Sequence, residues 1–319
     1  MAIETPTSVQ STNLVMMIRP ASFRMNEQTA VNNAYQQPGD GAGDAVERAQ
    51  EEFDGVVAAL KAQGVSVAVY EDNPEPDTPD ALFPNNWVSF HGDGKVGIYP
   101  MFAPNRRSER RESLLHSLVA DFGVHLDAIV DFTEFEDHGV YLEGTGSLIL
   151  DRVHRLAYAA IGPRTDRQAA EQFAETFGYE LVAFTAVQTT GVQTEPIYHT
   201  NVMLAIGTGW AVVCSESIAD PAQRKLVMDS LSATGHAIVD ITPQQVNGFA
   251  GNVLEVRTAE DTPCIAMSSA AYHAFTTEQR ATLTAHAPIV HAPIPTIEQL
   301  GGGSVRCMLA EVFLPKNAF

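Results

Sequence analysis

Short apolar runs alternate with longer amphipathic segments along the chain. Leu14–Ile18 and Val65–Tyr70 are apolar or β-branched runs of strand length. Between them, residues 44–63 carry apolar side chains at helical spacing, which predicts an amphipathic helix that ends at Gly64. This order of strand, helix and strand indicates a mixed α/β fold.

The same pattern recurs about every sixty residues, without marked sequence identity between the units. Apolar runs at 87–91 and 96–100 flank Gly92-Asp93-Gly94, a typical hairpin turn, and a helix is predicted from Arg106 to Phe122. Further strands are predicted at 139–141, 147–150, 156–160, 180–184, 202–206, 210–214, 252–257 and 264–268, and further helices at 165–177, 221–233 and 277–286. Periodicity alone is compatible with an ordinary α/β protein and with a closed ring of ββαβ modules.

Composition and charge narrow the class of protein. The 319 residues are 45% hydrophobic and 18% charged, which is enough for a sizeable buried core. The formal charge of −20 argues against nucleic acid or an anionic membrane surface as a partner, because both would repel the protein. No secretory signal or membrane-spanning stretch is evident, so we expect a cytoplasmic protein that binds a small molecule and could form a homo-oligomer. Residues 1–13 begin with the polar stretch Met1–Thr12 and are expected to be a flexible lead-in.

The three cysteines occupy different sequence contexts. Cys214 and Cys264 lie in apolar runs and are expected to be small core residues on strands. Cys307 instead follows Gly301-Gly302-Gly303, a loop that permits close approach of the backbone to a cleft. The alternative is that Cys307 is a core residue at the start of the last strand, residues 308–314. No pair of cysteines has the spacing of metal ligands.

Three further polar motifs stand at the ends of apolar runs. His199 lies in Ile197-Tyr-His-Thr-Asn201, Glu143 lies between an apolar run and two glycines, and Asn85-Asn86 follow Asp80 and a proline-rich stretch. Each motif alone has an ordinary explanation: a capping or core histidine, a solvated turn glutamate, and turn-forming asparagines. The amides could equally donate to and accept from a bound substrate.

In their order along the chain, these motifs resemble those of the arginine deiminase-like hydrolases and amidinotransferases, the pentein superfamily, and closely those of its citrulline-utilisation hydrolases. The resemblance extends from Val15 to Pro315 and implies an α/β propeller of five ββαβ modules, a single catalytic domain over residues 14–319, with the active site in its central channel. It rests on Phe83-Pro-Asn-Asn-Trp87, Leu142-Glu-Gly-Thr-Gly146, Pro163-Arg-Thr-Asp166, His199-Thr-Asn201 and Gly302-Gly-Ser-Val-Arg-Cys307.

The resemblance implies a catalytic role for three residues. Cys307 would be the nucleophile, His199 the general acid and base, and Glu143 the carboxylate that orients His199. A thiolate can attack the planar carbon of a guanidino or ureido group while the histidine protonates the leaving ammonia and later deprotonates water. This chemistry requires neither a metal nor a cofactor, because the histidine and nearby charges can activate the thiol.

Other matching positions would bind the amino-acid end of the substrate. The resemblance places Arg164 and the pair Arg106-Arg107 at the α-carboxylate, which a planar guanidinium can bind through two hydrogen bonds. Asp80 matches a polar position at the same end of the substrate.

The sequence departs from the deiminase pattern at two asparagines. Deiminases that bind a guanidinium usually have aspartate where Asn86 stands, and arginine deiminases have a second one where Asn201 stands. An amide both donates and accepts, so it suits a neutral ureido group better than a carboxylate does. We therefore expect a hydrolase that converts citrulline to ornithine, carbon dioxide and ammonia. The alternatives are an arginine deiminase or dihydrolase, an amidinotransferase with the same triad, a non-catalytic binding scaffold, and a purely structural Asn86 with Asp80 as the substrate carboxylate.

Overall fold

The computed structural model describes residues 9–39, 44–190 and 193–317, and these build five three-stranded sheets with the same pairing. In each sheet the central strand is antiparallel to one neighbour and parallel to the other. The first sheet contains β17 (Ala310–Glu311), β1 (Leu14–Arg19) and β2 (Ser66–Glu71). The others are β3 (Val88–Phe90), β4 (Lys95–Ile98) and β5 (Ala128–Asp131); β6 (Leu148–Asp151), β7 (Leu156–Ala160) and β8 (Glu180–Phe184); β11 (Leu204–Gly207), β12 (Trp210–Val213) and β13 (Ala237–Asp240); and β14 (Leu254–Arg257), β15 (Pro263–Ser268) and β16 (Ile289–Ala292).

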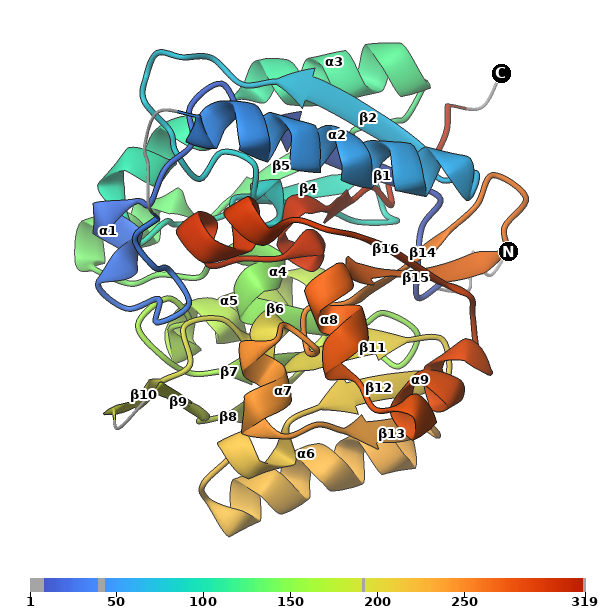
Figure 1. The fold of residues 1–319 in the computed structure, drawn as a ribbon. Coiled ribbons are helices and arrows are strands. Elements are labelled where there is room, and N and C mark those ends of the chain that lie inside the picture. The colour runs from blue at the N-terminus through green and yellow to red at the C-terminus, as the bar shows by residue number, and fades with distance from the viewer. Residues whose placement is uncertain (1–8, 40–43, 191–192, 318–319) are drawn as a thin grey trace.

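A helical crossover joins each central strand to its parallel neighbour, as the parallel pairing requires. The crossover helices are α2 (Ala45–Ala62), α3 (Glu112–Phe122), α5 (Arg167–Phe177), α6 (Pro221–Ala233), and the pair α8 (Ser269–Ala274) and α9 (Thr277–Thr284). In Figure 1, α2 and α3 lie along one edge of the molecule and α6 along the opposite edge, with strands between them. The chain thus has the mixed α/β fold that the alternation of apolar runs predicts.

The first sheet is assembled from both ends of the described chain. β17 pairs with β1 through Val15 opposite Glu311 and Met16 opposite Ala310. The one-turn segment η7 (Val305–Met308), which carries Cys307, immediately precedes β17. The position of Cys307 therefore depends on a pairing between residues almost 300 positions apart in sequence.

In three of the four remaining sheets, a one-turn segment precedes the strand that is antiparallel to the central one, as η7 precedes β17. We call this strand the first strand of its sheet. η1 (Pro84–Asn86) leads into β3, α4 (Gly144–Ser147) into β6, and η4 (Thr200–Val202) into β11. α4 contacts η1 and η4, and η1 contacts η7, so these turns gather in one region. The remaining elements are α1 (Glu27–Ala30), η2 (Pro104–Glu109), η3 (Thr133–His138), the hairpin β9 (Val187–Thr190) and β10 (Gln193–Pro196), η5 (Ser215–Ser217), α7 (Pro243–Asn247) and the π-helical η6 (Ile297–Gly301).

The structure corrects several details expected from the sequence. The helix expected from Arg106 to Phe122 is interrupted at residues 110–111, which have extended backbone angles, because η2 turns Arg106 inward to a buried pair with Glu109. The strand expected at 139–141 is absent from the described strands, and the adjacent Leu142 forms only an isolated bridge with Thr165.

The expected flexible lead-in also differs in part from the structure. Residues 1–8 lie outside the described residues, but Gln10, Ser11 and Thr12 are buried. Their side chains donate to the backbone carbonyls of Leu150 and Val312 and, from Ser11, to Glu255, so hydrogen bonding fixes this polar stretch. None of the helices in the described ranges has the length and apolar character needed to cross a bilayer.

Candidate active site

Each of the five sheets contributes a polar side chain from the turn before its first strand. η1 supplies Asn86, Glu143 caps α4, His199 caps η4, Asn252 lies two residues before β14, and η7 supplies Cys307. All five residues are buried. Four of them had been singled out from the sequence, and the structure brings these four together with Asn252.

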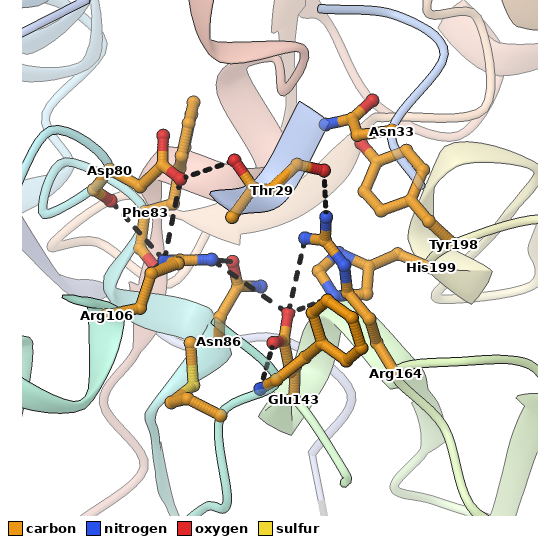
Figure 2. Close-up of polar contacts among 12 residues, drawn as sticks. Thr29, Asn33, Asp80, Phe83, Asn86, Arg106, Glu143, Arg164, Tyr198 and His199 are labelled. Atoms are coloured by element: carbon orange, nitrogen blue, oxygen red, sulfur yellow. Dashed lines mark hydrogen bonds and ion pairs between the residues drawn. The ribbon is translucent and has the colours of Figure 1, made fainter. Parts of the chain in front are cut away.

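Glu143 holds His199 by a direct hydrogen bond. The Nε2 atom of His199 lies 2.8 Å from the Oε2 atom of Glu143, whose Oε1 atom accepts from the backbone N–H of Phe102 at 2.9 Å. Figure 2 shows dashed lines from the Glu143 carboxylate to both His199 and the guanidinium group of Arg164. Because Nε2 carries the proton shared with Glu143, the Nδ1 atom of the neutral ring is left as the proton acceptor.

Burial and charge set the protonation states of this pair. Burial favours the protonated form of Glu143, but Arg164, His199 and Arg106 outweigh it and lower the pKa of Glu143 to about 2. Burial lowers the pKa of His199 to about 4, although the Glu143 carboxylate opposes this shift. At neutral pH the site therefore contains an ionised glutamate and a neutral histidine that can act as a base.

Two amide groups donate to the sulfur of Cys307. The Nδ2 atoms of Asn201 and Asn252 lie 3.3 and 3.2 Å from Sγ. The Nδ2 atom of Asn252 also donates to the backbone carbonyl of Asn201, which fixes the amide in place. The Oδ1 atoms of both asparagines are buried and have no partner among the described residues, and neither Asn201 nor Asn252 lines the cavity described below.

Arg106 and Arg164 are buried close to Glu143. Arg106 binds both carboxylate oxygens of Glu109, at 2.8 and 2.9 Å, and its Nη1 atom donates to Oδ1 of Asn86 at 2.8 Å. Arg164 donates to Oδ1 of Asn32 and to the backbone carbonyl of Thr29, and its Nη1 atom lies 3.6 Å from Glu143. These guanidinium groups surround the Glu143–His199 pair with positive charge (Figure 2).

Arg107 points away from the same region. Its guanidinium is one-third exposed and pairs with Glu136 at 3.2 Å, and Arg107 is not among the residues that line the cavity described below. Successive residues of a 3₁₀ turn project in different directions, so only one of the two adjacent arginines can face inward. Of these two adjacent arginines, only Arg106 therefore lies in the buried cluster around Glu143.

Asp80 and Asn85 also lie in the buried polar cluster. Oδ2 of Asp80 accepts from Nδ2 of Asn26 at 2.8 Å and from Thr29 at 3.0 Å, while its Oδ1 is buried and has no partner among the described residues. The Oδ1 atom of Asn85 accepts from the Nδ2 atom of Asn86 at 3.1 Å. Asp80 faces the cavity, whereas Asn85 does not line it.

Cys307 and His199 line one small cavity. It contains about 260 Å³ of empty space, and Asp80, Asn86 and Arg164 share its lining. Phe83 and Tyr198 provide apolar surface between these polar groups. The volume of about 260 Å³ includes open solvent, and water-sized spheres can enter only about 10 Å³ of it, so the lining side chains must move apart before an amino acid can bind.

Two glycines allow the Glu143 turn to approach its neighbours. Gly144 has a φ of +45°, and a Cβ there would lie 2.4 Å from the backbone oxygen of Asn85. A Cβ on Gly146 would lie 2.5 Å from Nδ2 of Asn86 and 2.8 Å from Nδ1 of His199. Both contacts are too short for a side chain, so the Glu-Gly-Thr-Gly sequence is required for these groups to converge.

The sequence did not identify the cavity-lining residues Thr29, Asn33 and Tyr198, nor the residue that donates to Cys307 from the turn before β14, Asn252. Its only local signal is the preceding Gly251, at which a Cβ would lie 2.2 Å from the backbone oxygen of Val202. As for possible metal ligands, the described residues contain one cluster of three ligating side chains, Asp151, His154 and His236, and none of them lines this cavity.

Comparison with known proteins places this geometry in a family. The model of the family described as eukaryotic N,N dimethylarginine dimethylhydrolase matches residues 19–314. A comparison with curated proteins finds no match.

Three solved structures illustrate the shared fold. One is unliganded ArgZ, an arginine dihydrolase from the ornithine–ammonia cycle in cyanobacteria, with a TM-score of 0.71 and 17% identity over 95% of this chain and 41% of that one. Unliganded AgrE gives a TM-score of 0.72 and 18% identity over 96% of this chain and 40% of that one. A dimethylarginine dimethylaminohydrolase adduct with S-methyl-L-thiocitrulline gives a TM-score of 0.61 and 14% identity over 93% of this chain and 98% of that one.

The likeness to these structures, at such low identity, establishes the fold, and this chain spans less than half the length of ArgZ and AgrE. The family model, by contrast, covers most of the chain. The protein therefore belongs to the N,N-dimethylarginine dimethylhydrolase family, within the pentein superfamily.

Proposed function

We propose that this protein is a cysteine hydrolase that cleaves C–N bonds in the ureido or guanidino group of a free amino acid, with citrulline as its substrate. The observation that carries the proposal is the shared cavity of Cys307 and His199, with Glu143 bonded to the far side of the histidine ring. A nucleophile, a base and an orienting carboxylate in this relation are the components of covalent catalysis at a planar carbon.

The reaction follows from these groups. The neutral ring of His199 accepts the thiol proton of Cys307, and the sulfur forms a bond with the ureido carbon. His199 returns the proton to the terminal nitrogen, which leaves as ammonia, so that a thiocarbamate joins Cys307 to the substrate. Water, deprotonated by His199, then breaks the S–C bond, and the released carbamate decomposes to ornithine and carbon dioxide. Glu143 stabilises the imidazolium that forms twice in this cycle.

The amino-acid end of the substrate fits the opposite wall of the cavity. Oδ1 of Asp80 is a buried acceptor that an α-ammonium group can satisfy. Nη1 of Arg164, held only by a 3.6 Å ion pair with Glu143, is positioned to receive the α-carboxylate. The N–H groups of Arg106 are directed at protein acceptors, so we assign Arg106 to the support of Asn86 rather than to direct contact with the substrate.

Asn86 favours a ureido over a guanidinium group because its amide orientation is fixed. Its Oδ1 accepts from Arg106, and one Nδ2 hydrogen is donated to Asn85. Asn86 can therefore donate only its second Nδ2 hydrogen to a ligand in the cavity. A ureido oxygen accepts such a hydrogen bond, whereas a guanidinium has only donors.

Arginine is the second candidate substrate, and the charge of the site favours it. The buried cluster contains the carboxylates of Asp80, Glu109 and Glu143 but the guanidinium groups of only Arg106 and Arg164 among the residues described here. Burial raises the pKa of Glu109 to about 8, whereas its two hydrogen bonds from Arg106 favour the carboxylate. When Glu109 is ionised, a cationic substrate would balance the charge of the cluster. An arginine dihydrolase would pass through a ureido intermediate at the same Asn86. An amidinotransferase and a non-catalytic scaffold remain alternatives that the assay below separates.

We further propose that the five sheets form a closed five-bladed ring. β17 contacts β3, and β11 contacts both β6 and β14, so first strands of different sheets adjoin one another. Such an arrangement would bring the five turns that precede these strands to one end of a central channel.

Ornithine and ammonia formed from citrulline and from arginine, measured side by side, test the function. We expect turnover of citrulline by the wild type and a loss of roughly tenfold to hundredfold in kcat/KM for Asn86→Asp, because the new carboxylate faces the ureido oxygen without a proton to donate. Asn247→Asp adds the same charge at an exposed position and is the matched control. Turnover of arginine alone would assign the enzyme to that substrate, and a folded protein inactive on both would refute a hydrolase of citrulline or arginine.

A further inference from the structure

A second group of reactive side chains bridges two neighbouring sheets. Asp151 ends β6, His154 lies in the turn between β6 and β7, and His236 lies between α6 and β13. One ligand atom from each of these residues lies within 4.8 Å of the other two. Asp151 is at the opposite end of β6 from Glu143, so this cluster is separate from the cavity that contains Cys307.

The hydrogen bonds of His236 show which ring nitrogen faces Asp151. Nδ1 of His236 lies 2.7 Å from the hydroxyl of Thr234, and that hydroxyl also lies within hydrogen-bonding distance of the backbone carbonyls of Ser230 and Leu231. When Thr234 donates to one of these carbonyls, it accepts from Nδ1–H of His236. In that tautomer the neutral ring presents the lone pair of Nε2 to the Asp151 carboxylate, 3.8 Å away.

Two acceptors that face each other in this way call for a cation between them. The side chains of Asp151 and His236 are buried, at 1% and 4% exposure, so water cannot readily screen the pair. A divalent ion between Oδ2 of Asp151 and Nε2 of His236 would satisfy both of these atoms.

We propose that Asp151, His154 and His236 bind a divalent transition metal of the Zn²⁺ class. Two ligands about 2.1 Å from a tetrahedral ion lie about 3.4 Å apart. The present separations from Oδ2 of Asp151 are 2.9 Å to Nδ1 of His154 and 3.8 Å to Nε2 of His236, on either side of that value. Two imidazoles and one carboxylate suit Zn²⁺, Co²⁺ or Ni²⁺ better than Mg²⁺ or Ca²⁺, which prefer oxygen ligands alone.

The surroundings supply what such a site needs beyond its ligands. Thr234 fixes the tautomer of His236, as groups around metal-bound histidines commonly do. His154 is half exposed, so its ring can carry the displaced proton on Nε2 and leaves room for water as a fourth ligand. A bound ion would join the β6–β7 turn to the loop between α6 and β13, and so tie two adjacent sheets together.

Zn²⁺ titration of the full-length protein, followed by calorimetry and by the thermal unfolding midpoint, tests this site. We expect one ion bound and a higher midpoint in its presence. His236→Ala should weaken binding at least tenfold, as should His154→Ala, which alters a half-exposed side chain and spares the core. The control is His125→Ala, which removes a histidine that lies 2.7 Å from Asp127 on the surface without a third ligand.

The active-site thiol is the main rival for the metal, so Cys307→Ala is titrated in parallel. Retention of the bound ion in Cys307→Ala and His125→Ala, with its loss in His154→Ala, supports the proposal. Loss of binding in Cys307→Ala alone would place the ion at the catalytic cysteine and overturn it. Binding unchanged in His154→Ala and His236→Ala, or no binding to the wild type, would overturn it as well.

Discussion

Cys307 and the other two cysteines are equally buried, yet their surroundings differ. Cys307, Cys264 and Cys214 are 3%, 1% and 0% exposed. Cys264 lies on β15 in an apolar core, where burial, with a smaller contribution from Glu255, raises the pKa of its thiol to about 11. Burial also raises the pKa of Cys214, although Ser217 donates to its sulfur. Cys307 borders the same apolar core as Cys264, but it also lines a cavity with polar walls and receives two amide hydrogen bonds.

If Cys307 is the nucleophile that we propose, burial alone does not make a cysteine inert. A buried thiolate is costly in apolar surroundings and is supported where N–H donors converge on the sulfur. Asn201 and Asn252 provide these donors at Cys307, and His199 lines the same cavity. The difference between the cysteines is therefore one of hydrogen-bond partners.

Removal of each thiol in turn gives the largest expected contrast. Cys307→Ala should lower kcat by more than about a thousandfold, because it removes the covalent nucleophile. Cys214→Ala and Cys264→Ala should retain most of the activity per folded molecule and lose some stability, because they leave small cavities in the core. Steady-state kinetics and thermal unfolding of the three variants measure this. An active Cys307→Ala variant beside an inactive Cys214→Ala variant would show that Cys307 is not the nucleophile.

Glu143→Gln should have the next largest effect, a loss of about a hundredfold or more in kcat. Glutamine keeps the shape of the side chain but cannot stabilise the imidazolium of His199. Glu136→Gln is the matched control, because it removes a carboxylate that pairs with Arg107 and Arg110 outside the cavity. Equal losses in the two variants, with circular dichroism unchanged, would show that Glu143 has no special link to His199.

The rates of alkylation by iodoacetamide at pH 8 should distinguish the three thiols directly. A pKa of about 11 leaves Cys264 a thiolate fraction of about one in a thousand, so its labelling should be about two orders of magnitude slower than that of a free cysteine. Its rate should rise about tenfold between pH 8 and 9, because both values lie below its pKa. Peptide mapping by mass spectrometry should find Cys307 labelled first. Native-state labelling of Cys264 or Cys214 as fast as that of Cys307 would contradict the distinction.

Asn252→Ala should give the smallest of these effects, about a tenfold decrease in the rate of Cys307 alkylation. The change removes one of two donors to the sulfur and leaves Asn201 in place. Asn247→Ala, at an exposed position on α7, controls for a general effect of the substitution. If alkylation is as fast in Asn252→Ala as in the control, the contact with Sγ does not stabilise the thiolate.

The sequence reveals the parts of the fold that carry a local signal. α6 and β7 have the predicted boundaries, because proline and aspartate mark the start of the helix and turn residues bound the strand. The returning strand β5 escapes notice, since its apolar run, Ala128-Ile129-Val130, is only three residues long and three of the four strand residues are exposed. Short, partly exposed strands are fixed by pairing with a distant strand rather than by their own composition.

The site shows the same division. Glu143, His199 and Cys307 stand out because glycine or polar residues interrupt an apolar context. Asn252 resembles the first residue of an ordinary strand, and only the packing of Gly251 against Val202 places it beside Cys307. Arg106 and Arg107 are equivalent in sequence, and the direction of one 3₁₀ turn decides which of them is buried.

The pairing of β17 with β1 has a consequence for synthesis on the ribosome. A nascent chain that has not yet emerged as far as Glu311 lacks both the strand partner of β1 and the reactive thiol of Cys307. The edge of β1 stays open until then, and open strand edges are prone to pair with other chains. The proposed site should therefore be completed abruptly, only once Glu311 has emerged, when the other four sheets can already have formed.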